Sequence, residues 1–391
     1  MTDGGTQTSD PRPLTPDRRL RLVITGGGTG GHVYPGLAVA EALSEPEGAT
    51  DILFVGGDGL ERQIVPRAGI PFRAVRSAPW PRRIGLATIP AGTTLAVGTA
   101  QSVVLLRRVR PHVVLATGGY ASVPVGTAAG LMGVPLVLQE QNLVPGAANR
   151  LLARWAVFVS VSHPAVASRF PSKAVVTGVP LRKAALGGDR QRGLARFGLA
   201  AGRLTVLVLG GSLGAASLNS AVVEMARTLP APAEIQVLHQ TGKDHLAWVR
   251  DRMASVPDAL KYAAVAYIDD IADAYASADI VIARSGAGTV AEVTAHGLPL
   301  VAVPYPHAVA GEQDAHARFL ETAGAATVIP AAALSGGALA DAVTALRGAP
   351  RRHAMAAASR VLGRPEAAAD VAALVRKAAA QTDGRAGWVR E

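Results

Sequence analysis

Short apolar runs recur along the chain, and each ends in a glycine-rich turn that a helix-like segment follows. Continuous runs of this kind predict strands of a parallel sheet that helices cover on both faces. The turns also predict where a ligand binds, because such sheets bind ligands at the carboxyl ends of their strands. The predicted strands are 22–24, 52–55 and 113–116 in the first half and 206–209 and 280–283 in the second.

The two halves of the chain carry a similar pattern. A turn at Gly118-Gly119 leads through a helix-like segment to Gly-Val-Pro-Leu-Val at 133–137. A turn at 285–288 leads in the same way to Gly-Leu-Pro-Leu-Val at 297–301. This echo predicts an α/β fold of two doubly wound, Rossmann-like domains, with parallel sheets facing across a cleft.

The expected boundaries follow from composition. Residues 1–20 are polar and rich in proline, without the apolar core of a signal peptide, so we expect a disordered cytoplasmic tail. Two long uncharged stretches, 84–106 and 113–139, are interrupted by glycine and proline, and we expect neither to span a membrane. The remaining expected parts are an N-terminal domain over 21–178, a C-terminal domain over 179–365, a helix over 366–382 that packs back on the N-terminal domain, and a frayed tail over 383–391.

Composition narrows the class of protein and of partner. With 391 residues and 49% hydrophobic content, the chain is long enough for two domains with large cores. It has no cysteine, so disulfides and thiolate metal sites are excluded. Lysine and arginine number 39 against 29 aspartates and glutamates, a net charge of +10. This balance favours an anionic partner, such as a nucleic acid, an acidic membrane or a phosphorylated substrate, or else a basic solvated surface.

The most glycine-rich turn lies at residues 25–32 and ends in His32. Glycines allow the backbone to approach a bound group closely, so the turn predicts a cradle for an anion or an oxygen. Gly26-x-Gly28-x-x-Gly31 also matches a dinucleotide fingerprint, but the second strand runs into Gly56-Gly57 where that motif needs an acidic residue. A neutral His32 at the rim of the turn is suited to accept a proton from an attacking hydroxyl.

The second half supplies groups suited to a nucleotide. The turn at 210–212 can wrap an anion, Ser285 is expected to cap the following helix, and Arg182 can neutralise a phosphate. Glu292, two turns into that helix, can accept both hydroxyls of a ribose. We therefore predict a nucleoside diphosphate on the second half and its acceptor on the first. The sequence lacks a P-loop lysine and an HExxH motif, and we expect no metal and no cofactor.

Residues 27–38, Gly-Gly-Thr-Gly-Gly-His-Val-Tyr-Pro-Gly-Leu-Ala, closely resemble the first glycine loop of the MurG-type N-acetylglucosaminyltransferases of peptidoglycan synthesis, in glycosyltransferase family 28. The resemblance covers roughly residues 21–380, with the motifs in family order. The further motifs are Gly118-Gly119-Tyr120, Glu140-Gln141-Asn142, residues 210–215, residues 267–270 and residues 284–292.

This resemblance implies a GT-B fold and an inverting reaction without a metal. The reaction moves GlcNAc from UDP-GlcNAc to the C4 hydroxyl of the muramyl sugar in undecaprenyl-diphosphate-linked muramyl-pentapeptide, converting lipid I to lipid II. Residues 21–178 are then the acceptor and membrane domain, and residues 179–365 bind UDP-GlcNAc. The implied location is peripheral, on the cytoplasmic face of the cell membrane, with other cell-wall enzymes as partners and no nucleic acid.

By motif, the resemblance assigns His32 as the catalytic base and places Gly118, Gly119, Tyr120 and Glu140 on the acceptor side. The residues that it assigns to UDP-GlcNAc are Thr29, Gly30, Gly31, Asn142, Arg182, Ser212, Ile268, Ala287, Gly288, Thr289, Val290, Ala291, Glu292 and Gln313. The chain departs from the family pattern at Gln139, Val179, Leu213 and His316, where His, Asn, Gln and Asn are usual.

An apolar patch with a cationic rim is expected to dock on an anionic membrane. Its members are Trp80, Ile84, Leu86 and Ile89, flanked by Arg82, Arg83, Arg107, Arg108 and Arg110.

Three other functions fit the residues. One is a different GT-B transferase, acting on another sugar nucleotide or glycolipid. The second is a UDP-GlcNAc 2-epimerase, and the third is a nucleotide- or membrane-binding protein without activity.

Overall fold

The structure is a computed structural model that describes residues 19–44, 50–80, 88–211, 213–256 and 259–385. Within this part the chain forms two compact units. Unit 1 holds the described residues of 19–140, 145–180 and 368–385, and unit 2 holds those of 141–144 and 181–367. Most of the expected tails lie outside the described residues. The first strand begins at Leu20, inside the expected first tail, and the last helix runs to Arg385, inside the expected second one.

Unit 1 is built on a seven-stranded parallel sheet in the order β3-β2-β1-β4-β5-β6-β7. Its strands are β1 (Leu20–Thr25), β2 (Thr50–Gly56), β3 (Phe72–Ala74), β4 (Val113–Ala116), β5 (Leu136–Glu140), β6 (Ala156–Val161) and β7 (Ala174–Val176). Its helices are α1 (Gly30–Leu43), α2 (Glu61–Arg67), α3 (Thr88–Val109), α4 (Ser122–Leu131), α5 (Ala147–Leu152), α6 (Pro164–Ala167) and α15 (Ala367–Arg385).

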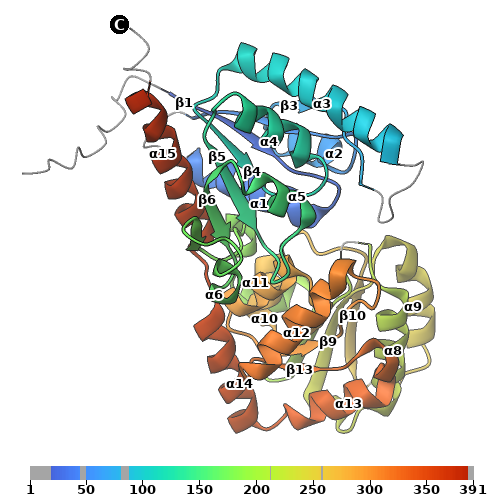
Figure 1. The fold of residues 1–391 in the computed structure, drawn as a ribbon. Coiled ribbons are helices and arrows are strands. Elements are labelled where there is room, and N and C mark those ends of the chain that lie inside the picture. Colours follow the sequence, from blue (N-terminus) through green and yellow to red (C-terminus); the bar gives the residue numbers. More distant parts are fainter. Residues whose placement is uncertain (1–18, 45–49, 81–87, 212, 257–258, 386–391) are drawn as a thin grey trace, which may run out of the picture. The chain divides into compact units, whose positions relative to one another are not determined.

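Helices α1 and α15 cover one face of this sheet. Figure 1 shows α15 in red, near the C-terminal end of the ribbon. Leu22 and Ile24 of β1 pack in one buried cluster with Leu37 of α1 and with Val371 and Val375 of α15. The C-terminal helix thus completes the core of a sheet whose first strand lies more than 340 positions earlier in the chain.

Helix α1 begins earlier than the sequence suggests. The glycine-rich turn was expected to extend to His32, but the helix starts at Gly30, with Pro35 inside it. Proline removes one backbone donor from a helix and fixes its own φ near the helical value, so the two glycines before His32 can still form the first turn. His32 therefore lies on the helix and not in the preceding turn.

Unit 2 is built on a six-stranded parallel sheet in the order β10-β9-β8-β11-β12-β13. Its strands are β8 (Leu204–Leu209), β9 (Ile235–Gln240), β10 (Lys261–Val265), β11 (Ile280–Ala283), β12 (Leu300–Ala302) and β13 (Ala326–Val328). Its α-helices are α7 (Arg190–Arg196), α8 (Ala216–Thr228), α9 (Leu246–Met253), α10 (Ile271–Ser277), α11 (Ala287–Ala295), α12 (Glu312–Thr322), α13 (Gly336–Ala345) and α14 (Ala349–Leu362). Short 3-10 helices lie at Lys183–Ala185, Pro232–Glu234, Lys243–His245, Val309–Gly311 and Ala331–Ala333.

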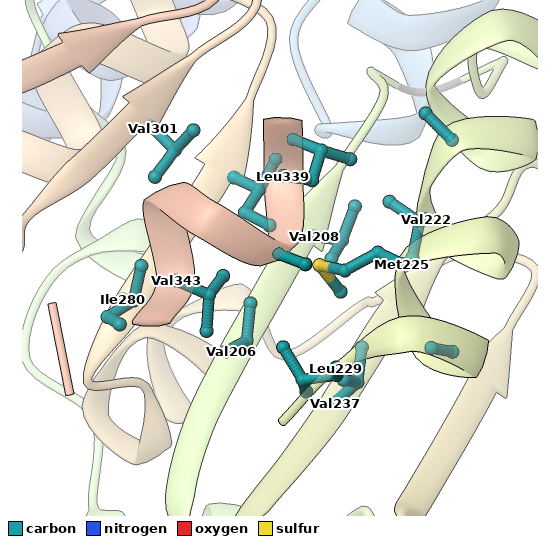
Figure 2. Packing of buried hydrophobic residues seen from close by; sticks show 14 of the residues in the cluster. Val206, Val208, Val222, Met225, Leu229, Val237, Ile280, Val301, Leu339 and Val343 are labelled. Atoms are coloured by element: carbon teal, nitrogen blue, oxygen red, sulfur yellow. The ribbon is translucent and has the colours of Figure 1, made fainter. Parts of the chain in front are cut away.

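Both faces of this second sheet are buried. Side chains alternate between the faces of a strand, and β8 sends Val206 and Val208 into one cluster and Leu207 and Leu209 into another. Figure 2 shows Val206 and Val208 beside Met225 of α8. The prediction of two doubly wound parallel sheets is confirmed, and the continuous apolar runs have their cause in this two-sided burial.

The two long apolar stretches have different structures. Residues 113–139 are divided among β4, α4 and β5. Most of the other stretch lies in α3, which is long and apolar enough by length and composition to cross a bilayer, and 22% of its most apolar window is buried. Helix α3 packs on α4, and Gly98 on α3 lies against the backbone of Arg76.

Two glycines of α3 offer a matched test of that packing. A Cβ at Gly98 would lie 1.8 Å from the carbonyl oxygen of Arg76, whereas nothing described lies within 4 Å of a Cβ at Gly92. We expect Gly98→Ala to lower the free energy of unfolding by about 1–3 kcal/mol, the usual range for overpacking. Gly92→Ala should raise it by about 0.5–1 kcal/mol, because alanine favours the helix. Urea denaturation measures both, and equal effects of the two substitutions would contradict the contact.

Candidate functional site

Each sheet has one point where the strand order reverses. In unit 1 the chain passes from β1 to β2 on one side and later to β4 on the other, so β1 and β4 flank the reversal. In unit 2, β8 and β11 flank it in the same way. Helices that leave such strands diverge and open a crevice at the carboxyl ends. The turns after these four strands contain most of the candidate residues.

His32 lies at the start of α1 with one ring nitrogen engaged. Thr29 is the N-cap of α1, but its Oγ1 lies 2.9 Å from His32 Nδ1 and does not cap the helix. Burial lowers the pKa of His32 to about 4, against the opposite effect of the Glu61 carboxylate. The ring is therefore neutral at pH 7. A proton on Nδ1 satisfies the bond to Thr29 and leaves the Nε2 lone pair to accept another.

The turn after β4 lies directly against His32. Gly118 and Gly119 have φ values of +96° and +77°. A Cβ at Gly118 would lie 3.3 Å from His32 Nε2, and one at Gly119 would lie 2.1 Å from the carbonyl oxygen of Gly27. Thr117 Oγ1 donates to the His32 carbonyl at 2.6 Å. Glycine is thus needed at both positions for the two turns to meet and for His32 Nε2 to remain uncovered on this side.

Of the other two residues predicted on the acceptor side, Tyr120 packs against a glycine and Glu140 is held by hydrogen bonds. The Tyr120 ring lies against Gly28, where a Cβ would be 2.8 Å from Cε1. Glu140, at the end of β5, is buried, and its Oε2 accepts from Asn149 Nδ2 and from the Gly146 amide, each at 2.9 Å. This carboxylate therefore orders the turn that leads into α5.

Sequence reasoning missed Asn149. Its Nδ2 also donates to the Gln139 carbonyl at 3.0 Å, and a Cβ at Gly118 would lie 3.5 Å from it. Asn149 and His32 therefore adjoin the same glycine. The Oδ1 atom of Asn149 is buried without a partner among the described residues. No motif in the sequence signals this, because the contact depends on the pairing of β4 with β5.

The first glycine turn is less open to anions than expected. The Gly28 amide donates to Glu61 Oε2 at 3.1 Å, so it is not available to a ligand. The amides of Gly30 and Gly31 lie in the first turn of α1, which has no side-chain cap. The part of this loop that suits an anion is therefore the helix start and not the preceding turn.

In unit 2, Gln240 holds together two turns at the strand ends. Its Nε2 donates to the Gly211 carbonyl at 3.1 Å, and its Oε1 accepts from the Ile268 amide at 2.9 Å. The Ile268 side chain is buried and its amide is engaged by Gln240. Gly214 lies so close to Thr241 that a Cβ there would be 1.9 Å from its carbonyl oxygen. Ser212, predicted to contact the donor, lies outside the described residues.

Helix α11 begins without a side-chain cap. The prediction that Ser285 caps it is wrong, because the N-cap is Gly286 and Ser285 Oγ instead donates to the Gln313 carbonyl at 2.8 Å. Serine is a frequent cap, but here β11 ends one residue before the turn and Ser285 points to the neighbouring chain segment. The uncapped amides of 287–289 remain free to bind an anion.

Glu292 is oriented by the buried Tyr275, whose ring stacks on the partly buried His296. Tyr275 Oη donates to Glu292 Oε2 at 2.8 Å, and the Tyr275 ring stacks on His296 with centroids 4.8 Å apart. His296 Nε2 in turn lies 2.9 Å from the Ala185 carbonyl. Burial raises the pKa of Glu292, while the hydrogen bond from Tyr275 and the charge of Arg182 lower it. Oε1 of Glu292 has no hydrogen bond to any described residue.

Gln313 and Asn142 approach the same end of α11. Gln313 Oε1 accepts from the Tyr305 amide at 2.9 Å, and its Nε2 would lie 3.9 Å from a Cβ at Gly286. Asn142 is buried, and the next residue, Leu143, donates its amide to His316 Nε2 at 3.2 Å. His316 Nδ1 lies 3.0 Å from the Ser285 carbonyl, so this neutral histidine joins the 141–144 segment to the turn before α11.

The predicted donor residues fall in both units. Thr29, Gly30 and Gly31 belong to unit 1, together with His32 and the four acceptor-side residues. The remaining described donor residues belong to unit 2, namely Asn142, Arg182, Ile268, residues 287–292 and Gln313.

Two family models match most of the chain. The model described as Glycosyltransferase family 28 N-terminal domain matches residues 22–160, and that described as Glycosyltransferase family 28 C-terminal domain matches residues 205–373.

Individual relatives match over nearly the same span. A protein of Moorella thermoacetica, named UDP-N-acetylglucosamine–N-acetylmuramyl-(pentapeptide) pyrophosphoryl-undecaprenol N-acetylglucosamine transferase, is 42% identical over 356 residues, which are 89% of this chain and 96% of the relative. A protein of the same name from Desulforudis audaxviator is 39% identical over 368 residues, which are 92% of this chain and 99% of the relative.

Solved structures agree with these matches. The crystal structure of Acinetobacter baumannii MurG has a TM-score of 0.75 and 30% identity, covering 92% of this chain and 99% of that one. The Staphylococcus aureus MnaA–UDP structure has a TM-score of 0.61 at 13% identity, covering 90% of this chain and 94% of that one, and this likeness concerns the fold alone.

Proposed function

The chain belongs to glycosyltransferase family 28, and we propose that it is the inverting enzyme that transfers GlcNAc from UDP-GlcNAc to the C4 hydroxyl of the muramyl sugar of lipid I, with lipid II and UDP as products. One observation carries this proposal: the chain covers 96% of a relative with this activity in its name, at 42% identity. The arrangement of groups at the two strand reversals supports it.

Unit 2 is suited to hold UDP-GlcNAc. The uncapped start of α11 and the guanidinium of Arg182 provide positive charge for the diphosphate, without a metal. Tyr275 holds one oxygen of Glu292 and leaves the other for the ribose hydroxyls. In this proposal the Ile268 carbonyl contacts the uracil, and Gln313 and Asn142 contact the sugar. The same positive groups stabilise the diphosphate as it leaves, which is where negative charge develops in the transition state.

His32 is suited to act as the general base. As the C4 hydroxyl oxygen bonds to the anomeric carbon of GlcNAc, its proton passes to His32 Nε2. The bond from that carbon to the UDP oxygen breaks, and the electron pair leaves with UDP. The hydrogen bond from Nδ1 to Thr29 orients the ring for this transfer. Gly118 and Gly119 keep side chains away from Nε2, so the acceptor can approach.

A membrane-facing surface lies on α3 of unit 1. Ile89, Val97 and Val104 are exposed on α3, and Trp80 is 57% exposed shortly before it. Arg107 and Arg108, also exposed, end the helix. Of the other expected members of the patch, Arg110 follows α3 and is exposed, whereas Arg82, Arg83, Ile84 and Leu86 lie outside the described residues. We propose that this surface docks the enzyme peripherally on the cytoplasmic face of the membrane, where anionic lipids and lipid I are found.

Transfer of labelled GlcNAc from UDP-GlcNAc to an extractable lipid I analogue tests the function and the base together. We expect His32→Ala to lower kcat by about 10² to 10⁴-fold, the usual contribution of a general base. UDP affinity, measured by calorimetry, should change less than about twofold, since the base adds little to ground-state binding. Glu292→Gln is the comparison variant, and it should weaken UDP binding by about tenfold through loss of a charged acceptor.

Two outcomes of this assay count against the proposal. Unimpaired turnover by folded His32→Ala would remove His32 from the mechanism. Epimerised sugar without lipid product from the unsubstituted chain would contradict the transferase function itself.

Binding to vesicles tests the membrane surface. We expect salt-sensitive binding to anionic vesicles, weakened about tenfold or more by the double substitution Arg107→Gln and Arg108→Gln, at about 1 kcal/mol for each charge. Ile89→Glu should weaken it as well, while Val361→Glu, at an exposed apolar residue of unit 2, should not. Co-sedimentation measures all four proteins. Equal binding to neutral vesicles at every salt concentration would refute docking through this surface.

A further inference from the structure

A fully buried carboxylate lies behind the glycine turn of unit 1. Glu61 is the first residue of α2, and its side chain has no exposed surface. Its Oε1 accepts from the Gly57 amide at 2.9 Å, and its Oε2 accepts from the Gly28 amide at 3.1 Å. One carboxylate therefore joins the turn after β2 to the turn after β1. Its contact in the turn after β1 is Gly28, which lies four residues before His32 in the sequence.

The surrounding glycines make room for this carboxylate. A Cβ at Gly27 would lie 2.3 Å from Glu61 Oε1, and one at Gly59 would lie 2.8 Å from Oε2. A Cβ at Gly56 would lie 2.7 Å from Glu61 Cγ. Three glycines from two turns thus fit around one side chain. The glycines of these turns therefore make room for the Glu61 carboxylate, in addition to their proposed role toward a bound ligand.

The charge of Glu61 has no lysine or arginine partner among the described residues. A buried carboxylate is unfavourable unless hydrogen bonds or an opposite charge compensate for the loss of water. Two amides supply hydrogen bonds, and the ionisable group that responds to the charge is His32, whose pKa Glu61 raises against the effect of burial. Protonation of His32 therefore supplies the positive charge that Glu61 lacks.

We propose, on the basis of the proposed function, that Glu61 is a positioning residue for the transfer: it fixes the turn that leads to His32 and stabilises the imidazolium that forms there. When the acceptor oxygen bonds to the anomeric carbon, its proton moves to His32 Nε2 and the electron pair of the broken bond leaves with UDP. The ring is then positive until solvent removes the proton. The fixed negative charge of Glu61 lowers the energy of that state.

Other ionisable groups near His32 come from different elements. The Tyr120 hydroxyl follows β4, and Glu140 at the end of β5 reaches this region through Asn149. Glu140 is held by the Asn149 amide and the Gly146 backbone, whereas Glu61 contacts the His32 loop itself. This difference makes Glu61 the carboxylate to test.

Glu61→Gln removes the charge and nearly preserves the volume. We expect kcat to fall by about tenfold, a part of the general-base contribution. KM for UDP-GlcNAc should stay within about twofold, because most of the predicted donor residues lie in unit 2. The acid limb of the pH profile of kcat/KM for the acceptor should move to lower pH, because His32 loses the charge that favours its protonation. A carboxylate that only stabilised the fold would leave this limb in place.

The matched control is Glu224→Gln. Glu224 Oε2 also accepts from a glycine amide, that of Gly336 at 2.9 Å, but in unit 2. This variant should keep the kcat and the pH profile of the unsubstituted enzyme. If Glu61→Gln does not fold, Glu61→Asp retains the charge, and we expect it to lower kcat while the acid limb stays in place. A limb that moves to lower pH in the aspartate variant would overturn the proposal.

A titration that needs no substrate separates this proposal from the proposed function. The His32 ring signal, identified by its loss in His32→Gln, is followed by NMR from about pH 8 down to about pH 3, because burial lowers the pKa of His32 to about 4. We expect its midpoint to lie lower in Glu61→Gln than in the unsubstituted chain or in Glu224→Gln. An unchanged midpoint would overturn the role of Glu61, whatever the transfer assay shows. If the His32 midpoint shifts but no GlcNAc is transferred, the proposed function is overturned and the effect of Glu61 on His32 stands.

Discussion

The close approach of backbone turns at the carboxyl ends of parallel strands governs the arrangement of unit 1. Gly119 meets the carbonyl of Gly27 at a distance that leaves no room for a Cβ, and Gly118 meets the ring of His32 in the same way. These contacts require positive φ values that glycine adopts without strain. Once the turns are joined, His32 has one orientation, with Nδ1 on Thr29 and Nε2 beside the glycine backbone.

Unit 2 uses the same sheet edge for a different purpose. Its turns are joined by side chains, chiefly Gln240 and His316, and the start of α11 is left uncapped. Glu292 is held by Tyr275 and keeps one oxygen for a ligand. A hydrogen bond to a charged group contributes about 1.5–3 kcal/mol, so this arrangement can discriminate a ribose with few contacts. In the proposed function the two units therefore have different roles, with the base in unit 1 and most of the nucleotide-binding groups in unit 2.

The sequence predicts the strands that flank the reversal of each sheet, and β2 beside them, but it misses others, including the buried inner strands β5 and β9. Strands β1, β4, β8 and β11 are almost fully buried and β2 is buried over its last three residues, and the apolar runs of these strands signal them directly. Strands β3 and β13 have only three residues each and are partly exposed, so they carry no such run. The start of α1 was placed too late because Gly30 and Gly31 do not favour a helix by composition.

His32 and Glu292 could be predicted, because each follows a glycine turn at a strand end. Glu61, Asn149 and Gln240 could not, because only tertiary packing shows that these polar side chains hold neighbouring turns together.

In the proposed function the nucleotide binds at the strand reversal of unit 2, although the first glycine turn matches a dinucleotide fingerprint. Hydrogen–deuterium exchange with and without UDP distinguishes the two places. We expect UDP to slow exchange at the amides of residues 287–290 and in the turn after β8, with no change at residues 26–28. Protection of residues 26–28 without protection of the start of α11 would contradict it.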